Sequence, residues 1–333
     1  MLNICLFGAG RMAQDHAKNI SHHSKSKIYC IVEPNTERGE SFSNHYSCRY
    51  YNDPKDAFSD KNIDAFVICS NSATHCELII EASRTGKPIF CEKPIGLNIS
   101  EIEQCIDALN KSQSSFLLGF NRRFDPDFQR LKQRITNNDI GRAYLLAITS
   151  RDHPMPPFSY LKDSGGIFHD MTIHDFDLAN WLLDDPVEEV YATGSCNIDP
   201  RLDEVQDADT VITILKTKSG KICHINNTRD TSYGYDQRIE VTGMKGMLKA
   251  KNLKPTSLEL SNESGFISDT CYHSFPQRYE NSYRLEINHF IDDVIINKDK
   301  PFVTATDGLY ATRIANAVKK SFMEKRRVLM SEV

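Results

Sequence analysis

Short apolar runs alternate with helix-like stretches over the first 120 residues of the chain. Each run has the length of a buried strand, and the stretches between them place apolar side chains three or four residues apart. The runs cover residues 2–7, 27–33, 63–69, 88–91 and 116–120. This alternation is typical of βαβ units, so we predict an α/β domain built on a parallel sheet.

One connection between these runs carries a helix start signal. Ser100 and Glu103 have the Ser-x-x-Glu spacing of a capping box, in which each side chain accepts a hydrogen bond from the other residue's backbone amide. Apolar Ile102, Ile106 and Leu109 follow at helical spacing. We therefore predict a helix that begins near Ser100.

The pattern changes after about residue 120. Helical spacing covers residues 125–135 and 171–183, and alternating positions indicate strands at 210–215, 221–226 and 238–242. Such alternation is typical of antiparallel strands with one solvated face. The chain then returns to helix, with one apolar face formed by Tyr283, Ile287, Phe290, Ile291 and Val294. We predict two domains, residues 1–120 and 121–333, the second an α/β domain with an open, mostly antiparallel sheet.

Charge and composition exclude several classes of protein. Across 333 residues, 40 Lys and Arg balance 45 Asp and Glu to a net charge of −5, and no basic stripe is present, so we expect no nucleic-acid partner. No apolar run approaches the ~18–20 residues of a bilayer span, and the first residues lack the order of a secretion signal. Ten cysteines occur without a C-x-x-C pair. We expect a cytoplasmic protein with reduced, mostly buried thiols and no membrane association.

A glycine-rich turn follows the first predicted strand and opens the first helix. Residues 8–13 read GAGRMA, the context in which G-x-G-x-x-G/A binds a dinucleotide at a helix N-terminus. Glu33 ends the second strand, 23 residues after Gly10, near the spacing of the acid that accepts ribose hydroxyls. A carboxylate there favours NAD over NADP. The predicted cofactor residues of this region are Gly8, Gly10, Arg11, Met12 and Glu33. The alternative is a glycine turn that only packs a helix against a strand.

A second polar cluster follows the third and fourth predicted strands, where open α/β sheets bind ligands. Ser70, Asn71 and His75 lie at one strand-to-helix turn, and we predict that they contact the cofactor. For Ser70 and Asn71, helix capping is an equal alternative. Glu92 and Lys93 precede a proline at the next strand end, so we predict that Lys93 faces the same crevice and that both residues contact the cofactor. The alternative is a surface lysine without a role.

The third cluster lies in the segment GGIFHDMTIHDFD, residues 165–177. Asp170 and His174 are four residues apart, so on one helix their side chains share a face, and the carboxylate orients the imidazole for acid–base chemistry. A competing interpretation makes His169, Asp170, His174 and Asp175 metal ligands, but adjacent residues on a helix point ~100° apart. We expect no metal. In the simplest alternative, Asp170 caps a helix and His174 is a half-buried structural histidine.

Four segments together resemble the Gfo/Idh/MocA oxidoreductases. They are residues 8–13, 92–94 (EKP), 119–126 (GFNRRFDP) and 165–177. The resemblance spans residues 1 to about 245 and is greatest with the members that oxidise inositol. It implies a Rossmann domain followed by an α/β domain with a large open sheet, whose exposed face commonly builds dimers or tetramers. It also implies a catalytic lysine with an aspartate and a histidine four residues apart, here Lys93, Asp170 and His174.

The resemblance leads to a specific expectation for the reaction. We expect NAD-dependent oxidation of a cyclic polyol, myo-inositol to 2-keto-myo-inositol, as a step of inositol catabolism by a homo-oligomeric enzyme, a dimer or tetramer. Lys93, Asp170 and His174 also contact substrate in this hypothesis. The other predicted substrate residues are Asn121, Arg123, Asp152, Tyr233 and Tyr235. Two alternatives stay open: the same chemistry on another sugar, polyol or dihydrodiol, and a non-catalytic NAD-binding regulator.

Overall fold

A computed structural model describes all 333 residues, which form two compact units. The first contains residues 1–124 and 281–310, and the second contains residues 125–280 and 311–333. The two predicted domains, divided once at residue 120, differ from these units because residues 281–310 return to the first unit. The apolar face of a helix does not indicate which core the helix joins, so its periodicity gave no sign of this return.

The first unit is built on a parallel sheet of six strands in the order β3-β2-β1-β4-β5-β6. The strands are β1 (Leu2–Phe7), β2 (Ser26–Val32), β3 (Arg49–Tyr51), β4 (Ala65–Ile68), β5 (Ile89–Glu92) and β6 (Phe116–Gly119). All five predicted strands are present, and the doubly wound parallel sheet is confirmed. The sequence did not predict β3, because its Arg-Tyr-Tyr contains no apolar run. The strand order reverses between β1 and β4, where such sheets bind ligands.

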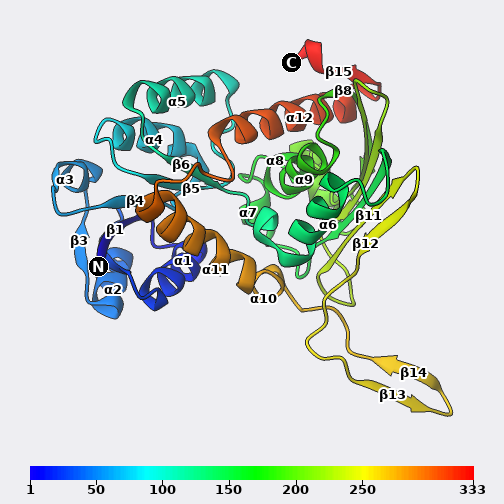
Figure 1. Cartoon of the computed structure of the whole chain (residues 1–333), viewed down its shortest axis with the longest axis horizontal. Coiled ribbons are helices and arrows are strands. Elements are labelled where there is room, and N and C mark those ends of the chain that lie inside the picture. The colour runs from blue at the N-terminus through cyan, green and yellow to red at the C-terminus, as the bar shows by residue number, and fades with distance from the viewer. The chain divides into compact units, whose positions relative to one another are not determined.

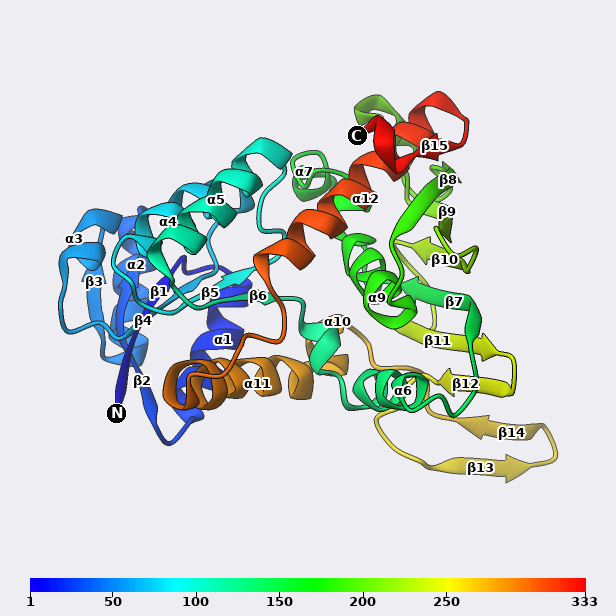
Figure 2. The ribbon, with the colours of Figure 1, turned by 45° about the horizontal axis from the view of Figure 1, so that its top comes forward.

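Helices cover both faces of this sheet (Figures 1 and 2). Helices α1 and α11 lie on one face, and α4 and α5 lie on the other. The helices of the unit are α1 (Arg11–His22), α2 (Thr36–Tyr46), α3 (Pro54–Ser59), α4 (His75–Ser83), α5 (Ile99–Ser112) and α11 (Glu280–Asn288), which continues as a π-helical segment, His289–Asn297. Every residue of β4, β5 and β6 is buried as a result. Burial on both faces explains why these strands appear in the sequence as continuous apolar runs.

The start of α5 differs from the predicted capping box. Asn98 is the N-cap residue, and its Oδ1 accepts hydrogen bonds from the amide and the hydroxyl of Ser100 at 2.9 and 2.8 Å. The predicted helix is present, but the prediction that Ser100 caps it is wrong. Asn is as good an N-cap as Ser, and the Asn two residues upstream takes the role.

The second unit contains a seven-stranded sheet in the order β12-β11-β7-β10-β9-β8-β15. The strands are β7 (Ala143–Arg151), β8 (Val187–Ser195), β9 (Thr210–Thr217), β10 (Ile222–Thr228), β11 (Asp236–Gly243), β12 (Gly246–Ala250) and β15 (Val328–Leu329). Neighbouring strands are antiparallel except β7 and β10, which run parallel. This confirms the predicted mostly antiparallel sheet. A separate hairpin, β13 (Glu259–Asn262) and β14 (Gly265–Ser268), follows β12.

Helices of the second unit lie on one face of this sheet and leave the other face open (Figure 2). They are α6 (Pro126–Thr136), α7 (Phe158–Leu161), α8 (Ile167–Asp170), α9 (Ile173–Leu183), α10 (Phe275–Arg278) and the greater part of α12 (Ala305–Glu324). Burial alternates along β9, with Val211, Thr213 and Leu215 buried and Ile212 and Ile214 exposed. The open face therefore carries apolar side chains.

Two expectations that came from the composition concern the cysteines and membrane-spanning helices. All ten cysteines are free thiols, and seven of them are buried. This confirms that the thiols are mostly buried, and their reduced state stays a prediction. None of the helices combines the length and the apolar character that crossing a lipid bilayer requires.

Candidate active site

The glycine turn after β1 has the geometry of a dinucleotide-binding loop. Gly8 has φ +92°, and a Cβ there would lie 2.7 Å from the carbonyl oxygen of Cys69, so the position requires glycine. Gly10 is the N-cap residue of α1, and a Cβ there would meet nothing within 4 Å. No side chain caps α1, and the N-terminus of such a helix can bind a phosphate group. Cofactor contact by Arg11 and Met12 in this first turn stays a prediction. The residues present fit a bound dinucleotide.

Glu33 follows β2 and is held beside this loop. The side chain is buried, and Oε2 accepts a hydrogen bond from the amide of Ala9 at 2.9 Å while Oε1 accepts one from the amide of Asn35 at 3.0 Å. The guanidinium of Arg38 lies 3.5 Å from Oε1. The carboxylate is thus fixed next to the glycine turn, as a ribose-binding acid requires.

The turn after β4 shows the capping role that the sequence left open. Asn71 Oδ1 accepts a hydrogen bond from the amide of Ala73, and the hydroxyls of Ser70 and Thr74 lie 2.7 Å apart. His75 is buried, with Nδ1 2.8 Å from the carbonyl oxygen of Pro94 and Nε2 3.2 Å from that of Ser70. Burial lowers the pKa of His75, which favours the neutral ring. His75 thus links the turn after β4 to the turn after β5, and cofactor contact by these three residues stays a prediction.

Lys93 lies directly after β5, at the same edge of the sheet as Gly8 and Ser70. The Glu92 carboxylate is buried, with Oε1 2.6 Å from His16 Nε2 and Oε2 accepting a hydrogen bond from the Lys93 amide at 3.1 Å. The side chain of Lys93 is half-buried. Because carboxyl ends of neighbouring parallel strands meet at one edge, these turns surround the switch point between β1 and β4.

The segment after β6 is more deeply buried than a substrate-binding role suggests. Asn121 and Arg123 are 2% and 4% exposed, and Arg123 forms an ion pair with Asp307 at 2.9 Å. The pairing of this buried guanidinium with a carboxylate is typical of a structural ion pair. Contact of either residue with substrate stays a prediction.

In the second unit, Asp170 ends α8 and is held by two partners. Its Oδ1 accepts a hydrogen bond from the Tyr160 hydroxyl at 3.0 Å, and its Oδ2 accepts one from Arg229 at 3.1 Å. Arg229 is fully buried and also lies 3.7 Å from Asp207. Charge-assisted bonds of this kind fix both the orientation and the ionised form of a carboxylate.

The helix that was expected to carry both Asp170 and His174 is interrupted between them. Asp170 ends α8, whereas His174 is the second residue of α9. The prediction of one continuous helical face is therefore wrong, because the chain changes helix at Met171 and Thr172. His174 is half-buried, and its pairing with Asp170 stays a prediction.

The residues of the competing metal interpretation are bound to separate partners. His169 Nε2 lies 2.7 Å from Asn316 Oδ1, and Asp175 accepts a hydrogen bond from Asn227 at 2.8 Å. These contacts turn the two side chains toward different parts of the unit. The closest grouping of potential metal ligands is elsewhere, at His16, Glu92 and Glu286 in the first unit.

The remaining predicted substrate residues lie along one edge of the seven-stranded sheet. Asp152 follows β7, and its amide donates to the carbonyl oxygen of Thr228 at the end of β10. Tyr233 is 39% exposed and donates to Asp236 at 2.8 Å, whereas Tyr235 is 4% exposed and packs edge-on against Tyr279. Tyr233 is thus available to a ligand, and Tyr235 is a core side chain.

Sequence reasoning missed the two partners of Asp170, which are Arg229 after β10 and Tyr160 of α7. Arg229 follows β10, and the parallel pairing of β7 with β10 brings it near Asp152. An arginine that follows a strand is usually a surface residue. The sequence around Arg229 therefore did not indicate that its side chain is buried. The long separation between Arg229 and Asp170 in sequence hides their pairing in the same way.

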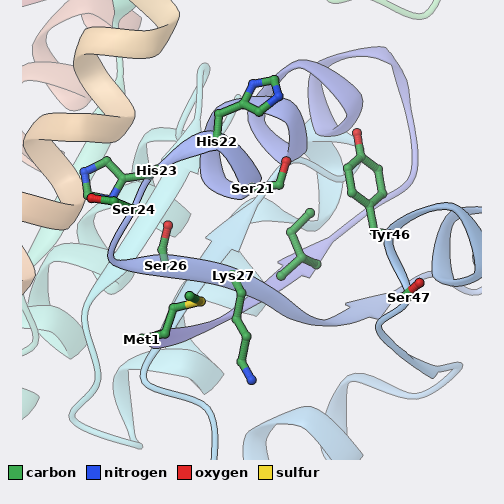
Figure 3. A pocket seen from close by; sticks show the side chains of 10 residues that line it. Met1, Ser21, His22, His23, Ser24, Ser26, Lys27, Tyr46 and Ser47 are labelled. Carbon is green, nitrogen blue, oxygen red and sulfur yellow. The ribbon is translucent and has the colours of Figure 1, made fainter.

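A pocket of about 370 Å³ in the first unit lies away from these residues (Figure 3). Its lining includes Met1, Ser26 and Lys27, at the amino ends of β1 and β2. The glycine turn lies at the opposite, carboxyl end of β1. The pocket therefore does not belong to the candidate site.

These features define an oxidoreductase with a dinucleotide-binding unit, and comparisons with known proteins agree. Residues 2–120 match the oxidoreductase family with an NAD-binding Rossmann fold, and residues 128–249 match the GFO/IDH/MocA C-terminal domain. The chain belongs to the Gfo/Idh/MocA family of oxidoreductases. The predicted family is confirmed.

Several relatives with known names match this chain over nearly its full length. The chain is 39% identical to myo-inositol 2-dehydrogenase of Thermotoga maritima, over 100% of this chain and 99% of the relative. It is 40% identical to inositol 2-dehydrogenase of Rhizobium meliloti, over 97% of each chain. The crystal structure of scyllo-inositol dehydrogenase from Lactobacillus casei, with bound NAD(H) and scyllo-inositol, superposes with a TM-score of 0.91 at 28% identity and covers 99% of both chains.

Proposed function

We propose that this protein is an inositol 2-dehydrogenase that oxidises myo-inositol to 2-keto-myo-inositol with NAD. The observation that carries the proposal is the match of about 40% identity, over nearly the whole chain, to two relatives named for this activity. The glycine turn and the buried Glu33 beside it support NAD as the cofactor. The preference for NAD over NADP is part of the proposal.

Lys93 and His174 have distinct roles in the proposed reaction. NAD, when bound, supplies the acceptor for the hydride that leaves the reacting carbon. We expect His174 to accept the proton of the reacting hydroxyl as a general base. We expect Lys93 to donate a hydrogen bond to the same oxygen and to stabilise the negative charge that develops there.

Asp170 holds the charge beside the proposed base. Its bonds to Arg229 and Tyr160 favour an ionised carboxylate in a fixed orientation. An ionised carboxylate next to His174 would stabilise the imidazolium that forms as the proton is taken up. Arg229 and Tyr160 thus join Asp170 in the proposal as its positioning partners.

A polyol needs several donors and acceptors around its ring. The proposed set is Lys93, Asn121, Arg123, Asp152, Asp170, His174, Tyr233 and Tyr235. Asp152 and Tyr233 are the stronger members, since both lie at the sheet edge and are partly exposed. Asn121, Arg123 and Tyr235 are buried, and in the proposal they also support the residues beside them that touch substrate.

Steady-state assays with a panel of substrates test the proposal. NADH formation is measured with myo-inositol, scyllo-inositol, several sugars and a dihydrodiol. We expect the highest kcat/KM with myo-inositol. A higher value with another compound would assign a different polyol to the same chemistry, and cofactor binding without turnover of any compound would indicate a regulator.

We further propose a homo-oligomer, a dimer or tetramer, formed through the open sheet face. Five large apolar side chains on β7 to β10 support it, with exposed fractions of 38–45%: Tyr144, Tyr191, Ile212, Ile214 and Ile222. An apolar patch of this kind marks an interaction site. Ten free thiols support a reducing compartment, which we propose is the cytoplasm, where the enzyme would serve inositol catabolism.

A further inference from the structure

Three ionisable side chains from distant parts of the sequence meet in the interior of the first unit. They are His16 of α1, Glu92 at the end of β5 and Glu286 of α11, and their polar atoms lie within 4.8 Å of one another. His16 and Glu286 are fully buried, and Glu92 is 7% exposed. The His16 ring also packs edge-on against Phe90 at 5.0 Å, which places the group in apolar surroundings.

The hydrogen bonds divide unequally among the three groups. Both oxygens of Glu92 are engaged, one by His16 Nε2 at 2.6 Å and the other by the Lys93 amide at 3.1 Å. Neither carboxyl oxygen of Glu286 has a hydrogen-bond partner. An ionised carboxylate that is buried without a donor is strongly destabilising, whereas a protonated carboxyl can itself donate. Glu286 therefore needs a proton in the folded protein.

The surrounding charges lead to the same protonation state. Burial first, and then the charge of Glu92, raise the pKa of Glu286 well above its ordinary value. The charge of Glu92 also acts on four neighbouring titratable groups, namely Asp15 of α1, Cys69 after β4, Cys91 of β5 and His75 of α4, and Lys93 acts on His75. Burial raises the pKa of both thiols and lowers that of His75, so these groups stay neutral and leave the charge of Glu286 uncompensated.

A metal ion is the competing occupant of this group. Two ligands bonded to one zinc ion at 2.0–2.2 Å in tetrahedral geometry lie about 3.3 Å apart. His16 Nε2 and Glu92 Oε1 are closer than that, at 2.6 Å, which is a hydrogen-bond distance. The geometry favours a shared proton over a metal.

We propose that Glu286 is a neutral acid buried beside His16 and Glu92, which share a proton, and that His16 is a positioning residue for Lys93. Glu92 binds the backbone amide of Lys93, so whatever fixes the Glu92 carboxylate also fixes the start of the Lys93 turn. His75 holds the other side of that turn through the Pro94 carbonyl. The positioning role rests on the proposed function of Lys93.

The pH dependence of stability tests the protonation of Glu286 without any need for turnover. Because the folded pKa of Glu286 is raised, its contribution to stability is fully present below its unfolded pKa and is lost as the pH rises toward the folded value. Glu286→Gln replaces the neutral acid with a neutral amide that does not titrate. We expect the Tm of the variant, relative to wild type, to rise steadily from about pH 5 to about pH 8.

A control variant and two further measurements accompany the Tm experiment on Glu286→Gln. Glu40→Gln, a substitution of an exposed glutamate in α2 of the same unit, serves as the control and should give a Tm difference that does not change with pH. A pH-independent difference for Glu286→Gln would overturn the proposal. If that variant does not fold, infrared spectra of the wild-type protein decide, since a neutral acid gives a protonated-carboxyl band at pH 7. Stoichiometric metal in the purified protein would also overturn the proposal.

Two substitutions of His16 test the positioning role. His16→Phe keeps the ring but loses the bond to Glu92, whereas His16→Gln places an amide donor near the position of Nε2. We expect His16→Phe to lower kcat about tenfold with KM and NAD affinity unchanged, and His16→Gln to recover most of the loss. Equal effects of the two variants, or none, would contradict it. If the wild type oxidises no polyol, the positioning role falls with the proposed function, while the Tm data still decide the protonation of Glu286.

Discussion

The six-stranded sheet of the first unit is buried on both faces, whereas the seven-stranded sheet of the second unit is buried on only one. Every residue of β4, β5 and β6 is buried, while β9 alternates buried and exposed positions. In the first sheet, polar chemistry is confined to the turns at the strand ends. The second sheet has polar residues after the ends of β7 and β10, and it also has apolar side chains on its open face. The proposed catalytic residues and the proposed oligomer face therefore lie on different surfaces, so substitutions can test them separately.

The largest expected effect falls on the proposed base. We expect His174→Ala to lower kcat by roughly 10²–10⁴-fold, because a positioned proton acceptor is lost, while NAD affinity stays near that of wild type. Steady-state kinetics and an NAD titration check both parts. His22→Ala, which removes an exposed histidine of α1, serves as the control. Near-normal turnover of His174→Ala would move the base to another residue, with Lys93 the first candidate.

Lys93 should show a similar but smaller loss. Lys93→Met keeps the apolar stem and removes the donor, and we expect kcat to fall by an amount equivalent to roughly 3–4 kcal/mol of barrier. Lys93→Arg keeps the charge in a different shape and should lose less. Stopped-flow measurement of hydride transfer distinguishes the variants, with the exposed Lys55→Met as the control. A wild-type rate in Lys93→Met would remove this residue from the site.

Cofactor choice should depend on Glu33 to a lesser degree. Like charges ~4 Å apart at an effective dielectric of ~20 repel by up to ~4 kcal/mol, which disfavours the 2′-phosphate of NADP. Arg38, 3.5 Å from the carboxylate, reduces this repulsion. We expect a preference for NAD of about tenfold or more in kcat/KM. Glu33→Ala should narrow the gap, as should Glu33→Gln, which keeps an oxygen for the Ala9 amide; equal values in the wild type would contradict the assignment.

Substitutions on the open face of the second sheet should change the oligomeric state, and they should leave the residues after the strand ends unaffected. We expect Ile212→Lys with Ile214→Lys to weaken association, because two charges would enter an apolar contact. Light scattering coupled to gel filtration measures the mass. Ile296→Lys places the same charge at an apolar side chain of similar exposure in the first unit, and should leave the mass unchanged. An unchanged mass for the double variant would show that the oligomer uses another surface.

Local patterns predicted a large part of the fold and of the cofactor loop. Gly8, Gly10 and Glu33 were found because strand, turn and acid lie within a short stretch of sequence whose spacing reflects geometry. Five strands of the first sheet and β9, β10 and β11 of the second were predicted for the same reason, since apolar periodicity is a local property, whereas β3, β7, β8, β12 and β15 were missed. The cap of α5 shows the limit of such signals, since Asn98 and Ser100 are both good caps and only the structure distinguishes them.

Contacts between distant residues could not be predicted in this way. Arg229 pairs with Asp170 from 59 residues away, and Glu286 meets His16 from the far end of the chain. Such pairs depend on which core a helix joins, and the periodicity of residues 283–294 does not contain that information. A buried acid also looks like a surface acid in sequence, because its unusual environment comes entirely from its neighbours.

Isotope transfer tests the central claim most directly. Wild-type protein is incubated with NAD and with myo-inositol that carries deuterium at C2, and the NADH formed is analysed by mass spectrometry. If the protein oxidises inositol at C2 by hydride transfer, the deuterium appears on the nicotinamide ring and NADH formation slows relative to unlabelled myo-inositol. NADH without deuterium would contradict oxidation at C2 by hydride transfer, and the absence of NADH would contradict the inositol dehydrogenase activity itself.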